Sequence, residues 1–245
     1  MTLAPKVPEF AWPARFTYEY SWKWLGWFLE GHSVFREALL RVWPRGIRRA
    51  LHLTERVAEI PFAIQGLALP RGSRILDVGA RWSPLPLFLS AMDYRVVAVD
   101  LSSFPIQGSG PQFVLADMRR PPFREGVFDG ATIVSTLEHV GLGFYDPKQD
   151  TEDDIRLMGL VRALIRPGGR VVLTVPFGAP ERDRHQRVYN RGRLRRVASE
   201  WTVETERYAI RDGAAWREAT EAEAAGVRSI PETHAVAMVV LRRPG

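Results

Sequence analysis

Two carboxylates and a glycine near the ends of predicted strands have a spacing that points to ligand binding. Asp77 and Gly79 lie where the apolar run 74–78 ends, and Asp100 ends a second run, 94–100. A carboxylate about 20 residues beyond such a glycine is placed to accept hydrogen bonds from ribose hydroxyls. The pattern predicts a nucleotide site in which Asp100 binds ribose and Gly79 lets the backbone approach the ligand. Asp77 is expected either to order the turn or to contact the ligand.

The residues after Gly79 distinguish between nucleotide types. A dinucleotide site needs further glycines, in the pattern G-x-G-x-x-G, so that the backbone can approach a pyrophosphate. This chain has Ala80, Arg81, Trp82 and Ser83 there, which disfavours a pyrophosphate. S-adenosylmethionine contains none and needs only a turn beneath its methionine and ribose. Gly79 with the small Ala80 is sufficient for that cofactor.

Two later motifs strengthen this interpretation. The residues LEHV (137–140) follow the predicted strand 128–134, and RPGG (166–169) precedes another strand. With these motifs the chain resembles the class I S-adenosylmethionine-dependent methyltransferases over roughly residues 71–200. The LEHV and RPGG pair is more specific than the glycine turn, where that family usually has G-x-G-x-G and this chain has Arg81 and Ser83.

The resemblance implies that S-adenosylmethionine is the cofactor and adds residues to its site. Asp117, which ends the short predicted strand 113–117, would accept a hydrogen bond from the adenine amino group, and Met118 would lie against the adenine ring. A turn acid is an equally good explanation of Asp117. Three further residues are assigned to the cofactor: Arg81, Leu101 and Ser135.

Four residues are candidates for the catalytic side, where the methyl acceptor would bind: His139, Tyr145, Asp146 and His185. His139 follows the fourth predicted strand and has an ordinary pKa suited to removing a hydroxyl proton near neutrality. Its alternative is a histidine hydrogen-bonded beneath the loop. His185 is the rival base, because nearby arginines could hold an anionic acceptor and would keep the ring neutral. Tyr145 and Asp146 are expected to orient the acceptor.

The arginines around His185 suggest two alternatives. Arg182, Arg184, Arg187, Arg191, Arg193, Arg195 and Arg196 lie within one short stretch of a chain whose net charge is +6. Their field could attract an anionic acceptor, or they form a solvated loop and helix face. Nucleic acid is an unfavoured partner, although an RNA-binding role for this face is the basis of one alternative function.

The acidic cluster 150–154 resembles a magnesium site at first sight. The apolar positions of a helix follow it directly, and acids in a first helical turn offset the exposed N–H groups and the helix dipole. We therefore predict a helix start and no metal.

The predicted elements bring these residues to one edge of a sheet. The fold class is α/β, a doubly wound, seven-stranded and mostly parallel Rossmann-like sheet with the ligand at the carboxyl ends of the strands. Ser83 and Pro84 signal the first helix of this domain. Strands are expected over 201–210 and 235–241, the latter antiparallel at the sheet edge, as the resemblance implies. A short helix or loose insertion is expected over 214–225.

Residues 1–70 are predicted to be an aromatic-rich helical extension that folds as a lid over the cofactor edge, and residues 71–245 the S-adenosylmethionine-binding domain. Two helices are readable in the extension, and the second is expected to stop or bend near Pro61. Packing without a functional role, a homodimer contact and a membrane-interface belt are the alternatives.

Composition limits the class of protein. A chain of 245 residues suits one catalytic domain with an appendage. It contains no cysteine, so thiolate chemistry and disulfides are excluded. No apolar run reaches a transmembrane length, and the start lacks a signal-peptide pattern, so the cytoplasm is the expected location.

The predicted function is methyl transfer from S-adenosylmethionine to a small-molecule acceptor, such as a sugar or another hydroxylated metabolite. Two other classes remain open. One is a non-catalytic, methyltransferase-like binding protein. The other, disfavoured by the missing glycines, is a nicotinamide-dependent oxidoreductase.

Overall fold

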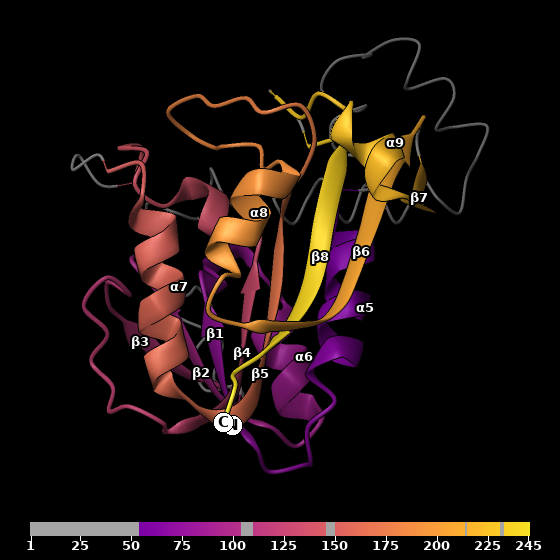
Figure 1. Cartoon of the computed structure of the whole chain (residues 1–245). Helices are drawn as coiled ribbons and strands as arrows, with labels where there is room; N and C mark the ends of the chain where they lie inside the picture. The colour runs from indigo at the N-terminus through magenta and orange to yellow at the C-terminus, as the bar shows by residue number, and fades with distance from the viewer. Residues whose placement is uncertain (1–53, 104–109, 146–149, 214, 231–232) are drawn as a thin grey trace, which may run out of the picture. The chain divides into compact units, whose positions relative to one another are not determined.

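The structure is a computed structural model that describes residues 54–103, 110–145, 150–213, 215–230 and 233–245. The chain divides into two units, residues 1–54 and 55–245, and all the described helices and strands lie in the second (Figure 1). The first of the two helices expected in the extension lies outside the described residues, and so do residues 1–30, which hold its tryptophan- and tyrosine-rich part and are called the aromatic segment below. The lid role of the extension therefore stays a prediction.

Within the described residues, eight strands form a sheet in the order β3-β2-β1-β4-β5-β8-β6-β7. Neighbours from β3 to β5 pair in parallel, whereas β8 is antiparallel to both β5 and β6, and β7 is antiparallel to β6. The strands are β1 (Arg74–Val78), β2 (Arg95–Asp100), β3 (Gln112–Leu115), β4 (Phe128–Val134), β5 (Ile165–Pro176), β6 (Thr202–Asp212), β7 (Ala215–Ala219) and β8 (Ala235–Arg242).

The predicted doubly wound, mostly parallel sheet is confirmed, but two details of its second half were wrong. The sheet has eight described strands rather than seven, because β7 forms within 214–225 before the short helix α9 (Glu221–Ala225). Trp216 is the only large apolar residue in β7, so the segment shows little of a strand's apolar alternation. In addition, β8 lies between β5 and β6 and not at the edge. Its uninterrupted apolar run fits a strand buried on both faces.

Helices cover both faces of the sheet. On one face, α5 (Arg56–Leu67) and α6 (Leu85–Ala91) supply Ala63, Leu67, Leu85 and Leu89 to one apolar cluster. On the other face, α7 (Asp153–Leu164) and α8 (Arg191–Val197) contribute to a second, larger cluster, and Figure 1 shows these two helices in front of the strands. Helix α6 begins as predicted, since the Oγ of Ser83 accepts a hydrogen bond from the N–H of Leu85 (3.1 Å) just before it.

Helix α5 differs from the expectation at Pro61. The helix continues through this residue to Leu67, although proline removes one helix hydrogen bond. Ala63 and Leu67 are fully buried, and Gly66 lets the helix approach the sheet, because a Cβ there would lie 2.8 Å from Cγ2 of Val240. Packing on the sheet thus outweighs the missing hydrogen bond. Helix α7 ends at Leu164 and β5 begins at Ile165, so the residues RPGG (166–169), which were expected to precede this strand, lie within its bounds.

No helix in the described ranges has both the length and the apolar character that crossing a membrane requires.

Candidate functional site

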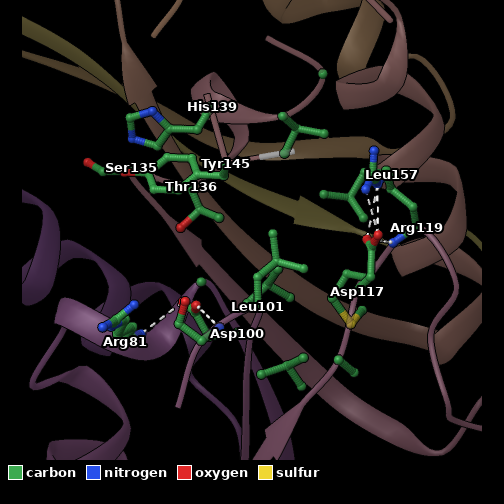
Figure 2. Close-up of a pocket in the computed structure, with 18 of the residues that line it drawn as sticks. Arg81, Asp100, Leu101, Asp117, Arg119, Ser135, Thr136, His139, Tyr145 and Leu157 are labelled. Carbon is green, nitrogen blue, oxygen red and sulfur yellow. Dashed lines mark hydrogen bonds and ion pairs between the residues drawn. The ribbon is translucent and has the colours of Figure 1, made fainter. Parts of the chain in front are cut away.

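A cavity of about 320 Å³ opens at the carboxyl ends of β1, β2 and β4 and beside the loop after β3. Its walls come from residues that follow these strands, from the loop after β4 and from the start of α5 (Figure 2). The lining residues are Arg56, Val78, Gly79, Arg81, Val99, Asp100, Leu101, Ser102, Ala116, Asp117, Met118, Arg119, Ser135, Thr136, His139, Val140, Gly141, Gly143, Tyr145 and Leu157. The set includes most of the residues predicted for a cofactor.

Asp100 is fixed by two backbone N–H groups. Its Oδ2 accepts a hydrogen bond from the N–H of Arg81 (3.1 Å), and its Oδ1 accepts one from the N–H of Ser102 (2.9 Å). A carboxylate offers about four acceptor positions, so further positions can accept hydrogen bonds from a ligand. This donor and acceptor chemistry fits a ribose diol.

Gly79 adopts the left-handed conformation, with φ of 79° and ψ of 41°. A Cβ at this position would lie 2.2 Å from Oγ1 of Thr136. Glycine is therefore required by the approach of the Thr136 side chain as well as by the backbone angle. Both residues line the cavity.

Asp77 and Ala80, which were predicted to belong to the cofactor site, do not line the cavity. Asp77 is 2% exposed, and its Oδ1 accepts a hydrogen bond from Thr132 of β4. Burial raises the pKa of Asp77 to about 7. This hydrogen bond links β1 to β4, so the two expectations for Asp77, ordering the turn or contacting the ligand, stay predictions. Ala80 is buried at the first position of the turn η3 (Ala80–Trp82).

Asp117, Met118 and Leu101 all line the cavity. The Asp117 carboxylate accepts hydrogen bonds from the Arg119 side chain, from Nη2 at 2.6 Å and from Nε at 3.0 Å. Met118 is largely buried, whereas Leu101 is 49% exposed. Arg119 was not singled out in the sequence. Its proximity to Asp117 in the chain is the signal that would have suggested the ion pair.

Ser135 is connected to α5 through a buried carboxylate. The Ser135 Oγ donates to Oε1 of Glu59 (2.8 Å), and Thr174 Oγ1 of β5 donates to the same oxygen (2.7 Å). Glu59 has no exposed surface. Ser135 itself has a φ of 41°, which is unusual for a residue other than glycine.

Arg56 completes this connection. Its Nη1 donates to Oε2 of Glu59 (3.3 Å) and to the carbonyl oxygen of Val134 (3.1 Å), and Arg56 lines the cavity. Sequence analysis missed both Arg56 and Glu59. A charged residue between Ala58 and Ile60, on a helix that packs against the sheet, was the available signal for Glu59.

His139 is held with both ring nitrogens near groups of the chain. Nδ1 lies 2.5 Å from the carbonyl oxygen of His185, so Nδ1 carries the proton and donates it. Nε2 lies 3.7 Å from Oε1 of Glu138. Burial lowers the pKa of His139 to about 4. His139 is therefore neutral at physiological pH, and the alternative of a hydrogen-bonded histidine beneath the loop describes its position.

Glu138 is a buried carboxyl group that sequence analysis did not consider. It is 2% exposed, and its Oε2 has no hydrogen-bond partner among the described residues. Burial raises the pKa of Glu138 well above its usual range. Burial thus disfavours the charged form of the carboxyl group beside Nε2 of His139.

Tyr145 and His185 meet beside His139. The Tyr145 hydroxyl lies 3.3 Å from Nε2 of His185, and burial raises the pKa of Tyr145, so the hydroxyl remains protonated. Tyr145 lines the cavity. His185 is exposed and is not one of the lining residues. The structure thus brings together His139, Tyr145 and His185, three of the four catalytic candidates. Asp146 lies outside the described residues.

Several arginines near His185 are engaged with acids. Arg187 and Arg193 both bind Asp154, at 2.7 Å and 2.6 Å, and Arg191 and Arg196 pair with Glu221 and Glu152. Burial opposes ionisation of Asp154, but its hydrogen bond from Arg193 and the charge of Arg187 hold its pKa below the usual value. These pairs reduce the local positive field that an anionic acceptor would need.

The acidic cluster 150–154 starts α7 as predicted, with Asp153 and Asp154 in the first turn. Asp150 and Asp153 both pair with Arg156. Across the described ranges, no group of three or more histidines or acids is arranged to hold a metal ion.

Comparison with known proteins gives both a family match and a curated relative. The family described as "Caenorhabditis protein of unknown function, DUF268" matches residues 122–204. The S-adenosyl-L-methionine-dependent Diels-Alderase iliD of Neonectria sp. (strain DH2) is 25% identical over 150 residues, which are 61% of this chain and 54% of that protein. The chain thus matches about half of the length of this relative.

Solved structures show the same architecture. The 1,6-didemethyltoxoflavin-N1-methyltransferase of Burkholderia thailandensis, with bound 1,6-didemethyltoxoflavin and S-adenosylhomocysteine, has a TM-score of 0.55 at 19% identity, covering 88% of this chain and 90% of that chain. The 4+2 cyclase SpnF has a TM-score of 0.57 at 14% identity, covering 76% and 80%. The chain has the fold of the class I S-adenosylmethionine-dependent methyltransferases, which confirms the predicted resemblance at the level of the fold.

Proposed function

We propose that this chain binds S-adenosylmethionine and transfers its methyl group to a small molecule. The cavity at the carboxyl ends of the parallel strands supports this function most directly, since Asp100 faces it from the end of β2 and Tyr145 from the loop after β4 (Figure 2). In open α/β sheets, ligands bind in the crevice at these strand ends.

On the cofactor side, Asp100 would accept hydrogen bonds from the ribose hydroxyls. Leu101 and Met118 would supply apolar surface for adenine. The Asp117 carboxylate would accept a hydrogen bond from the adenine amino group. Gly79, Arg81 and Ser135 would lie along the methionine part. Once bound, the cofactor supplies a methyl group already activated by a positively charged sulfur. The chain's own task is to align the acceptor and exclude water.

On the acceptor side, Tyr145 and His185 are better placed than His139 to remove a proton. His139 uses Nδ1 to hold the His185 carbonyl oxygen and directs Nε2 toward Glu138. Tyr145 lines the cavity and touches Nε2 of His185. We assign Tyr145 as a relay: its oxygen takes the acceptor's proton while its own proton passes to Nε2 of His185.

Calorimetric titration of the full chain with S-adenosylhomocysteine tests the cofactor assignment. We expect binding at micromolar concentration and no binding of NAD. Binding of NAD instead would support the oxidoreductase alternative. Salt-dependent RNA binding without cofactor binding would support the non-catalytic alternative.

A second candidate function is a cyclisation that uses the cofactor without consuming its methyl group. The names of the relative iliD and of SpnF, a 4+2 cyclase, favour considering it. The two functions differ in stoichiometry. Methyl transfer forms one S-adenosylhomocysteine per product molecule, whereas a cyclisation forms product and leaves the S-adenosylmethionine concentration unchanged. Chromatographic measurement of both nucleosides during turnover separates them.

A further inference from the structure

Four aromatic rings contact one another near the loop after β4: Tyr145 and His139 line the cavity, and Phe144 and His185 lie next to them. The ring centroids of Phe144 and Tyr145 are 4.9 Å apart, with planes at 79°. Phe144 and His185 are 4.8 Å apart at 87°, and Tyr145 and His139 are 5.5 Å apart at 79°. In Figure 2, Tyr145 lies beside His139 and Thr136, away from Asp117 and Arg119. The planes in these three ring pairs are thus nearly perpendicular. We call the four rings the ring corner.

Two of these rings are exposed to an unusual degree. Phe144 is 57% exposed and Tyr145 is 55% exposed. Aromatic side chains supply large apolar surface that is usually buried, and adjacent exposed ones at the rim of a cavity are typical of ligand sites. A corner of perpendicular rings offers one ring face and one ring edge, the two arrangements in which a further flat ring packs best.

The loop that carries these rings is held in place. Gly141 and Gly143 have φ values of 76° and 82°. A Cβ on Gly141 would lie 1.9 Å from the carbonyl oxygen of Asp150, so this part of the loop is packed closely against the start of the next helix. The loop is thus packed closely at Gly141, three residues before Phe144.

Charged groups of both signs lie near the corner, since Arg56, Arg81 and Asp100 line the same cavity. His139 is neutral at physiological pH because burial lowers its pKa to about 4, and burial raises the pKa of Glu138 above its usual range. The nearby Arg187 is 3% exposed and bound to Asp154. His139 and Arg187 thus offer an anionic acceptor no free positive charge beside the rings.

We propose that the acceptor is an uncharged, planar aromatic or heteroaromatic molecule that lies against Phe144 and Tyr145 and carries the O–H or N–H that is methylated. The proposal rests on the proposed methyl transfer and names its substrate class. The acceptor oxygen or nitrogen loses its proton to the Tyr145 oxygen as the Tyr145 proton moves to His185. That atom then bonds to the methyl carbon while the carbon–sulfur bond breaks, and the electron pair stays on sulfur.

The test compares matched acceptors on the full chain. Phenols and uncharged N-heteroaromatics are paired with uncharged saturated counterparts of the same size, such as phenol with cyclohexanol and 2-pyridone with 2-piperidone. Binding to the protein loaded with S-adenosylhomocysteine is measured by saturation-transfer NMR, and methylation is measured with labelled donor. We expect aromatic members to bind and to be methylated at least ten times more efficiently than their counterparts. Equal use of saturated members, or of sugars, would overturn the inference.

Substitutions test whether the ring of Phe144 is responsible for the preference for aromatic acceptors. Phe144→Leu keeps apolar bulk but loses the ring. It should weaken the binding of aromatic acceptors about five-fold. Phe144→Ala should weaken them by about ten-fold or more. Phe88→Leu is the control, because Phe88 is a comparably exposed phenylalanine (46%) that lies on α6 and makes none of the ring contacts given above. Equal acceptor affinity in the Phe144 variants and the control would contradict the assignment.

Binding of S-adenosylhomocysteine distinguishes a failure of the proposed function from a failure of the proposed acceptor class. If the cofactor product does not bind at all, the proposed function fails. If it binds normally but no planar aromatic compound is bound or methylated, the acceptor class is wrong and the cofactor site stands. Tyr145→Phe adds a mechanistic readout: it should lower kcat about 100-fold with little change in KM, since the ring remains and the proton relay is lost.

Discussion

At the scale of single residues, Asp100 is the clearest link between local sequence and cofactor binding. The backbone N–H groups of Arg81 and Ser102 hold its carboxylate in place before any ligand binds. Such preorganisation lowers the cost of ordering the site on binding. The affinity for the cofactor should therefore depend on the charge of this side chain.

Asp100→Asn should weaken S-adenosylhomocysteine binding about ten-fold, because a hydrogen bond to a neutral acceptor is weaker than one to a carboxylate by roughly 1–1.5 kcal/mol. Isothermal titration calorimetry measures the change. Asp93→Asn is a matched control, since Asp93 is an exposed acid at a φ of 67°, which asparagine tolerates. Unchanged affinity in Asp100→Asn would remove Asp100 from the cofactor site.

Gly79→Ala should lower the free energy of unfolding by about 2–4 kcal/mol. The left-handed φ costs about 1–2 kcal/mol, and the new Cβ would overlap Thr136. Urea denaturation measures the loss. The double variant Gly79→Ala with Thr136→Ala should recover part of it, because Oγ1 and Cγ2 of Thr136 are two of the three atoms that overlap. Strictly additive losses would show that Thr136 does not explain the glycine.

His139 should make the free energy of unfolding depend on pH. Burial lowers its pKa from 6.5 to about 4, so between these values the folded protein binds fewer protons at this site than the unfolded chain. Its contribution to stability is then full above pH 6.5 and is lost as the pH falls toward 4. Over that window, the unfolding free energy of the wild type minus that of His139→Gln should rise with pH by up to about 3 kcal/mol.

Because Asp77 is present in both the wild type and His139→Gln, its contribution to the pH dependence of stability cancels in the difference between the two proteins. The raised pKa of Asp77 acts in the opposite direction, because stability from that site falls as the pH rises from 3.8 toward about 7. NMR titration of the His139 ring gives an independent readout. A measured pKa near 6.5 would contradict the buried position of His139.

At the scale of elements, α5 connects one face of the sheet to the cavity. Its Glu59 accepts hydrogen bonds from Ser135 after β4 and from Thr174 in β5, and its Arg56 lines the cavity. One carboxylate thus fastens a helix to the carboxyl ends of two central strands. The loss of such a buried, fully bonded acid leaves several donors without their acceptor.

Glu59→Ala should therefore lower the free energy of unfolding by about 3 kcal/mol and weaken S-adenosylhomocysteine binding at the same time. Urea denaturation and calorimetry measure the two effects. Glu125→Ala is the control, because Glu125 is exposed in a turn between strands. If the variant loses stability but binds the ligand as the wild type does, then α5 supports the sheet without shaping the site.

At the scale of the whole molecule, the chain separates into residues 1–54 and 55–245. The second unit contains the sheet, both described apolar clusters on its faces and the cavity. Such a unit has the core that independent folding requires. The expected role of the aromatic segment 1–30 as a cover over the site remains a prediction.

Deletion of residues 1–30 tests that role. The remaining chain should unfold cooperatively and bind S-adenosylhomocysteine, because Asp100, Asp117 and the other described lining residues remain. If the segment covers the site, the KM for the acceptor should rise or turnover should cease, since water would then reach the reacting groups. A truncated protein as active as the whole chain would assign the segment to packing or assembly.

The sequence by itself determined the features that depend on neighbouring residues. The apolar runs, the turn at Gly79, the helix start at Ser83 and the acid at Asp100 predicted an α/β sheet with a nucleotide site, because strand, turn and capping preferences act over a few residues. The LEHV and RPGG motifs then pointed to the fold that the comparisons confirm. The local signals and the resemblance together named nine of the twenty described residues that line the cavity, among them Gly79, Asp100 and Tyr145.

The tertiary structure alone decided which distant groups meet. Glu59 reaches Ser135 across 76 residues, and His139 meets His185 across 46. No local preference encodes such contacts, because they depend on how helices and loops pack on the sheet. The same holds for β8, whose apolar run indicated a buried strand but not its place between β5 and β6. Burial, which lowers the pKa of His139 and raises that of Glu138, follows from that packing and not from residue type.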